Sequence, residues 1–172
     1  MFPIRSYVVP SSGTASVTFD LTGITGYTNL QIRGIARNTY TGGTGSVDNL
    51  FIQLNGDTAN NYSAHSLDGY GTTAGAQYYL GETFGFFIMQ SGGTGTQPFG
   101  AFVLDILDAF NTNKYKTIRG LAGIDGNGYG RIVLGSGSWR NTNAITSIKL
   151  FSSGGTYNLA QYSSFALYGV KA

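Results

Sequence analysis

Apolar and polar residues alternate over short stretches of the chain, which is the pattern of β-strands with one buried face. In residues 15–21 the odd-numbered positions are apolar or small and the even-numbered ones are polar. Residues 84–90 are almost wholly apolar and predict a strand covered on both faces. Strands are expected at residues 15–21, 30–37, 50–55, 60–67, 84–90, 99–108, 114–124, 129–134, 144–151 and 165–171.

Glycine-rich stretches separate these predicted strands. Asn55-Gly56-Asp57 and residues 125–128 (DGNG) have the composition of tight turns. The remaining stretches predict loops or irregular chain at residues 41–46, 68–76, 91–96 and 135–139, with a hairpin tip at 111–113. Many short strands at this spacing are typical of sandwiches and barrels. We therefore expect one all-β domain over residues 1–172, a two-sheet antiparallel sandwich, with residues 1–12 as an extended N-terminal arm.

Charge is scarce in this chain. Charged residues make up 10% of the 172 residues, against roughly 25% in an ordinary soluble domain. The formal net charge is +2 and the basic residues are scattered, whereas a nucleic-acid surface needs clustered Lys and Arg. Nucleic acid is therefore not an expected partner. Free monomers usually carry more charge for solubility, so the composition favours a homo-oligomer or another assembly that covers much of the surface.

The cellular context is also constrained by what the sequence lacks. The chain has no cysteine, which excludes disulfides, thiolate zinc sites and thiol catalysis. Residues 1–10 contain no apolar run typical of a signal peptide. No apolar stretch approaches the roughly 20 residues of a membrane helix. We expect a protein made in the cytoplasm that is not secreted and does not enter a membrane.

Catalytic patterns are weak. The single histidine, His65, stands apart from any G-x-S-x-G nucleophile motif and is interpreted as a surface or interface residue. Asp105 and Asp108 are three positions apart in a predicted strand, so their side chains point to opposite faces. We expect them to mark a strand end and a turn, with Lys114 or Lys116 as cross-hairpin partners.

Ligand motifs are equally weak. Residues 125–128 resemble the start of a calcium loop, but Tyr129 and Ser136 stand where an EF-hand needs oxygen ligands. Carboxylates brought together by the fold remain a second route to calcium. The glycine-rich stretches lack the Lys-Ser/Thr of a phosphate loop. The sequence therefore predicts a non-enzymatic protein, with no catalytic, cofactor-binding or metal-binding residue to name.

Surface aromatics are the best candidates for a contact site. Several lie in or beside polar, glycine-rich stretches, where they either plug the ends of the core or anchor an interface, with sugar stacking as a third role. Two arginines on the polar face of residues 30–37 join them. The candidate interface residues are Arg33, Arg37, Tyr70, Tyr78, Tyr79, Trp139 and Tyr157.

Four segments together resemble a family of tailed-phage structural proteins. They are residues 30–37 (LQIRGIAR), 55–62 (NGDTANNY), 114–119 (KYKTIR) and 165–171 (FALYGVK), in this order. The resemblance spans most of the chain from about residue 30 onward. It implies a virion component with a jelly-roll-like fold, and proteins of this kind occur as capsid cement or decoration proteins and among tail and fibre components. It implies no catalytic residue.

Three functions follow as hypotheses. The first is a capsid cement or decoration protein, a dimer or trimer that binds the major capsid protein or other virion proteins across capsomer joints, with the N-terminal arm adding a strand to a neighbour. The second is a tail or fibre component that binds host surface glycan through exposed aromatics. The third is an enzyme such as a glycan depolymerase, which no residue set supports. The expected location is the virion.

Overall fold

The computed structural model describes residues 1–40, 47–91, 98–152 and 157–171, with the backbone alone for 86–91. The loop predicted at residues 41–46, and most of the one at 91–96, lie outside the described residues. The described chain contains strands and no helix, and none of it forms a helix of the length and apolar character needed to cross a bilayer. The strands are β1 (Phe2–Val8), β2 (Ser16–Asp20), β3 (Asn29–Ala36), β4 (Val47–Leu54), β5 (Tyr62–Tyr70), β6 (Thr73–Glu82), β7 (Gly85–Ser91), β8 (Gly100–Leu107), β9 (Lys116–Asp125), β10 (Gly130–Trp139), β11 (Ser147–Ser152) and β12 (Ser164–Val170).

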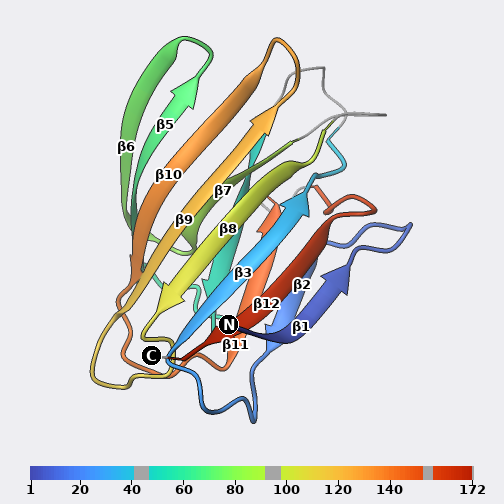
Figure 1. The fold of residues 1–172 in the computed structure, drawn as a ribbon. Coiled ribbons are helices and arrows are strands. Elements are labelled where there is room, and N and C mark those ends of the chain that lie inside the picture. The colour runs from blue at the N-terminus through green and yellow to red at the C-terminus, as the bar shows by residue number, and fades with distance from the viewer. Residues whose placement is uncertain (41–46, 92–97, 153–156, 172) are drawn as a thin grey trace.

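The strands form two antiparallel sheets, and this confirms the predicted sandwich (Figure 1). The small sheet has the order β2-β11-β4-β7, and the large sheet has the order β1-β12-β3-β8-β9-β10-β5-β6. The four strands β1-β12-β3-β8 together with the small sheet make an eight-stranded jelly roll, because the chain crosses repeatedly between two four-stranded sheets. The jelly-roll-like expectation is therefore confirmed.

Two hairpins extend the large sheet beyond the jelly roll. The β5–β6 hairpin is inserted between β4 and β7, and the β9–β10 hairpin between β8 and β11. β9 pairs with β8, β10 joins β9 to β5, and β6 forms the far edge. In Figure 1 the green β5–β6 hairpin lies at the end of the sheet opposite β1. This extension leaves a broad outer face on the large sheet.

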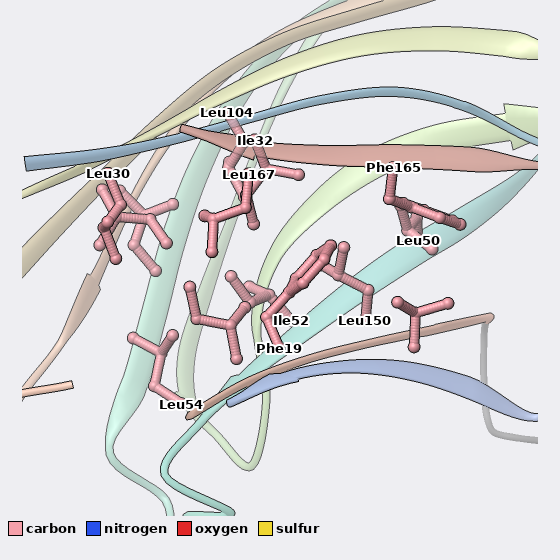
Figure 2. Close-up of a cluster of buried hydrophobic side chains, with 14 of the residues drawn as sticks. Phe19, Leu30, Ile32, Leu50, Ile52, Leu54, Leu104, Leu150, Phe165 and Leu167 are labelled. Atoms are coloured by element: carbon pink, nitrogen blue, oxygen red, sulfur yellow. The ribbon is translucent and has the colours of Figure 1, made fainter. Parts of the chain in front are cut away.

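The core fills the space between the sheets, as the period-two pattern predicts. In β2, Val17 and Phe19 are buried while Thr18 is exposed. Leucine, isoleucine and phenylalanine side chains from both sheets converge in the interior (Figure 2). Burying each such side chain contributes about 1.5–3 kcal/mol, so this shared core is the main source of the sandwich's stability. The labelled core residues are Phe19, Leu30, Ile32, Leu50, Ile52, Leu54, Leu104, Leu150, Phe165 and Leu167.

Two stretches predicted to be irregular are strands. Residues 68–76 form the end of β5, a tight turn and the start of β6. Tyr70 pairs with Thr73 across this turn, and Gly71 within it has a φ of 56°. Glycine adopts this conformation without steric cost, which permits the tight reversal. Residues 135–139 continue β10, because this segment pairs with β9 on one side and β5 on the other. Pairing on both sides overrides the weak strand propensity of Gly and Ser.

The N-terminal segment also differs from the expectation. Residues 2–8 of the predicted arm are β1, which pairs antiparallel with β12 of the same chain. Val9 follows and is buried, with its N–H donating to the carbonyl of Ser163. These contacts attach the segment to its own sheet, so it does not extend as a free arm.

Trp139, predicted as an interface candidate, is a core residue instead. It has no exposed surface, stacks on Tyr62 and donates its indole N–H to Asp57 Oδ2 at 2.7 Å. A buried indole needs such an acceptor, and the turn after β4 provides it. That turn is the one predicted at Asn55-Gly56-Asp57, since Asn55 and Gly56 have φ values of 55° and 65°.

Asp57 accepts further hydrogen bonds beside Trp139. Its Oδ2 accepts from Asn61 Nδ2 at 2.8 Å and its Oδ1 from the Ala59 N–H at 2.9 Å. Burial raises the pKa of the Asp57 carboxyl, but these hydrogen bonds, with the one from Trp139, outweigh it and hold the pKa below its usual value. Asp57 is therefore ionised and fixes the end of β10 to the turn.

A second buried polar group lies in β9. Lys116 is fully buried, and its Nζ donates to the carbonyl oxygens of Asn111, Lys114 and Thr142 at 2.6, 2.9 and 3.1 Å. Burial lowers the pKa of this ammonium group. The three carbonyls use its three donors, so Lys116 fastens the β8–β9 connection to the segment after β10.

Candidate functional site

The outer face of the hairpin extension carries a row of apolar side chains. β9 and β10 bury one face, since Ile118 and Val133 point inward and β7 of the small sheet packs against these strands. The alternate residues of β9 and β10 point outward to solvent. The register places five apolar residues opposite one another on neighbouring strands, in the order Val103, Leu121, Leu134, Leu67 and Ala76.

Further apolar residues border this row. Ala101, Ile132 and Ala74 share the outward direction on β8, β10 and β6. Leu121, Leu134, Leu67 and Ile132 have 45%, 50%, 57% and 57% of their surface exposed. We call the row with these three residues the outer apolar face. Isolated exposed leucines are common, whereas a continuous exposed apolar row is the type of surface through which proteins contact other molecules.

A polar row lies directly beside the outer apolar face. It crosses the sheet in register through Tyr168, Gln31, Asp105, Arg119, Ser136, His65 and Tyr78. Asp105 accepts from Gln31 Nε2 at 2.7 Å and from Arg119 Nη2 at 3.0 Å. Arg33 donates to Gln31 Oε1 at 2.6 Å. These exposed bonds contribute little to stability, but they orient charged groups along one border of the apolar face.

The two rows meet in a shallow groove. The groove has a volume of 430 Å³ and is lined by His65, Leu67, Arg119 and Leu134 among others. His65 stacks on Tyr78, with 6.0 Å between ring centroids. The lining therefore combines two leucines with a histidine and an arginine, a mixture of apolar and polar groups that protein contact surfaces also have.

A second concavity lies at the tips of the two hairpins. It has a volume of 710 Å³, and its lining includes Phe99, Asp125, Tyr129 and Arg131. Arg131 is held by Asp68, with 2.9 Å between Nη2 and Oδ2. An aromatic ring beside an acidic and a basic side chain is the chemistry that suits a small polar ligand such as a sugar. We refer to it as the hairpin-tip hollow.

The predicted interface residues are not gathered into one site. Tyr78 is 68% exposed on the outer side of β6, and Arg33 lies near the polar row, over the ring of Tyr168. Tyr70 is exposed at the turn between β5 and β6. Tyr79 is partly buried on the other side of β6.

Of the other three candidates, Trp139 is in the core, and Arg37 and Tyr157 lie elsewhere on the molecule. Arg37 is half-buried over the ring of Phe99, 4.9 Å from its centroid, and Tyr157 packs edge-on against Tyr40 at 5.0 Å. Sequence reasoning missed Leu67, Leu121, Ile132 and Leu134. A sequence pattern could have indicated them: where both odd and even positions of a strand are apolar, as in Ile132-Val133-Leu134, both faces of that strand are apolar.

The carboxylates have structural partners. Asp108 pairs with Lys114 at 3.1 Å, which confirms one of the two partners expected across the hairpin, and Asp105 pairs with Arg119. Residues 125–128 form the β9–β10 turn, with the Gly126 N–H donating to the Tyr129 carbonyl. Within the described ranges, no three His, Cys, Asp or Glu side chains lie close enough together to hold a metal ion.

Comparisons with protein-family models, with curated proteins and with solved structures find no match to this chain.

Proposed function

We propose that the protein is a structural component of a tailed-phage particle, a cement or decoration protein that docks onto the capsid through its outer apolar face. The observation that carries the proposal is the exposed row of Leu121, Leu134 and Leu67 on a rigid sheet. The jelly-roll topology and the segments that resemble phage structural proteins support the same assignment.

The dimensions of the face suit protein docking. Neighbouring strands lie about 4.8 Å apart, so the five strands from β8 to β6 span about 20 Å across the face. The outer apolar face occupies two outward positions on β10, Ile132 and Leu134, and the polar row adds a third at Ser136, at about 6.8 Å per outward step. The apolar face and the polar row together therefore form the contact surface, and protruding side chains extend it toward the roughly 800 Å² that each partner contributes to a standard interface.

The chemistry of the face favours a protein partner. Leucine and isoleucine at its centre are desolvated on contact, whereas the Asp105–Arg119 pair at its border sets the orientation of the partner. We infer that the partner is the major capsid protein or another shell protein, with an apolar patch bordered by charge. Contacts of this type across capsomer joints would strengthen the shell against internal DNA pressure.

Particles that lack the protein provide the test. Purified wild-type protein should cosediment with such particles, and Leu134→Lys should lower the bound fraction at least about tenfold, because a buried unpaired charge opposes docking. Tyr115→Lys is the control, since Tyr115 is 57% exposed but lies outside the face, in the β8–β9 connection. Binding that Leu134→Lys leaves intact, or binding only to tails, would contradict the proposal.

A second candidate function is glycan recognition by a tail or fibre component. The observation that favours it is the hairpin-tip hollow, with Tyr129 beside Asp125 and Arg131. A glycan array with wild type and Tyr129→Ala tests it: loss of signal in the variant supports this function, and no binding by wild type rejects it. Trp139→Ala is unsuitable for this purpose, because Trp139 is buried and its removal would act on the fold.

A further inference from the structure

The two edges of the large sheet differ in how they are protected. At one edge, β1 carries Pro3 and Arg5, and its pairing with β12 is irregular between these residues. Proline, charge and bulges are the features by which natural sheets prevent edge-to-edge pairing. The β1 edge is therefore blocked to a further strand.

The other edge, β6, has none of this protection over most of its length. Residues 73–81 (TAGAQYYLG) contain no charged residue and no proline, and the first six are all exposed. The pairing of β6 with β5 is regular from Thr73 to Leu80, and its single irregularity lies beyond, near Glu82. A long, uncharged, regular edge strand is a template on which another strand can pair.

The sequence of β6 identifies which strand fits. Small residues fill its first half (Ala74, Gly75 and Ala76) and large residues its second half (Tyr78, Tyr79 and Leu80), with Gln77 between them. If two copies of β6 run antiparallel with Gln77 opposite Gln77, each small residue lies opposite a large one. Ala74 then faces Leu80 of the second copy, Gly75 faces Tyr79 and Ala76 faces Tyr78.

Neighbouring registers weaken this complementarity at the twofold axis. A shift of the centre to residue 76 or 78 leaves Ala76 opposite Ala76, or Tyr78 opposite Tyr78, at the twofold axis. Cross-strand pairs of large with small side chains pack without clash or void, so the register centred on Gln77 is preferred. The same register puts equivalent faces of both sheets on one side, because residues opposite each other in an antiparallel pair point the same way.

We propose that the protein forms a twofold dimer in which β6 pairs antiparallel with β6 of a second copy, centred on Gln77. The two large sheets become one continuous sheet, and the two outer apolar faces lie side by side. This inference goes beyond the proposed function, since the pairing takes place in solution whether or not the protein binds a capsid.

Cysteine cross-linking tests the register directly, because the chain has no cysteine of its own. Opposite residues of an antiparallel pair have Cα atoms about 4.5–5.5 Å apart, which lies within the disulfide range. Gln77→Cys should therefore give a disulfide-linked dimer under mild oxidation. Ala74→Cys is the matched control on the same strand, since its two copies would lie about 20 Å apart.

Efficient cross-linking by Gln77→Cys with little by Ala74→Cys supports the proposal. No cross-link at residue 77, or equal cross-linking at both positions, overturns it. Sedimentation supplies an independent measurement: wild type should dimerise, Gln77→Lys should raise the dissociation constant at least about tenfold through like charges at the axis, and Ser6→Lys on the blocked β1 edge should not. A wild type that stays monomeric up to about 100 µM also overturns the dimer.

Discussion

Asp57→Ala offers the sharpest test of how the extension is attached to the jelly roll. The carboxylate of Asp57 accepts from the indole of Trp139, from Asn61 and from the backbone of Ala59. Asp57 precedes β5, whereas Trp139 ends β10, so the hydrogen bond joins segments 82 residues apart in the sequence. Removing the carboxylate breaks all three contacts while leaving the apolar core unchanged.

The size of the effect follows from burial. Trp139 is fully buried, so its indole N–H would keep no partner and cost about 1–3 kcal/mol, as for other buried unpaired donors. Asn61 and Ala59 lie in a partly exposed turn, where water replaces the lost bonds at lower cost. We expect Asp57→Ala to lower the free energy of unfolding by about 3 kcal/mol, which corresponds to a Tm lower by about 6–12 °C for a chain of this size.

The assay is urea unfolding followed by circular dichroism and by the fluorescence of the single tryptophan. Asp125→Ala is the matched control. Asp125 accepts a backbone N–H two residues ahead, from Asn127, as Asp57 does from Ala59, but it contacts no buried donor. If both variants lose the same stability within about 0.5 kcal/mol, the indole hydrogen bond does not have the assigned role.

Three further predictions concern the same fold. Hydrogen bonding lowers the pKa of the Asp57 carboxyl on folding, so the ionised carboxylate stabilises the fold above about pH 4. This stabilisation is lost as the pH falls through the folded-state pKa. The wild type should therefore lose more unfolding free energy than Asp57→Asn between about pH 5 and pH 2. Lys116→Met should cost about 2 kcal/mol in urea unfolding, because carbonyl oxygens lose their donor. Gly34→Ala should lower the free energy of unfolding by about 1–3 kcal/mol, because a Cβ at residue 34 would overlap the Ser164 carbonyl oxygen. Gly123→Ala is the control in the same assay: a Cβ there would lie 3.5 Å from its nearest atom, so this variant should cost less.

Period-two alternation predicted the buried faces well where one face is apolar and the other polar. Val17 and Phe19 in β2, and Ile118 in β9, lie inside as expected. It failed to identify the outer apolar face, because Ile132, Val133 and Leu134 are all apolar and alternation cannot tell which side the small sheet covers. The cover comes from β7, a strand remote in sequence from β10.

Long-range partners explain the other differences. β6 and the end of β10 are rich in glycine and small residues, and they are strands because neighbouring strands pair with them. Trp139 packs in the core, and Asp57 satisfies its indole N–H there, a contact that local sequence does not show. The β1 pairing with β12 likewise joins opposite ends of the chain. Local pattern therefore predicted most of the strands and the buried faces of those that alternate, whereas tertiary pairing determined β1, β6 and the end of β10.

Electron cryomicroscopy of the phage particle proposed to carry the protein would show where it binds. Jelly-roll density should lie on the capsid shell, with Leu67, Leu121 and Leu134 of the outer apolar face against a shell protein. Density confined to the tail, or a shell-bound protein whose outer apolar face points to solvent, would contradict the proposed function.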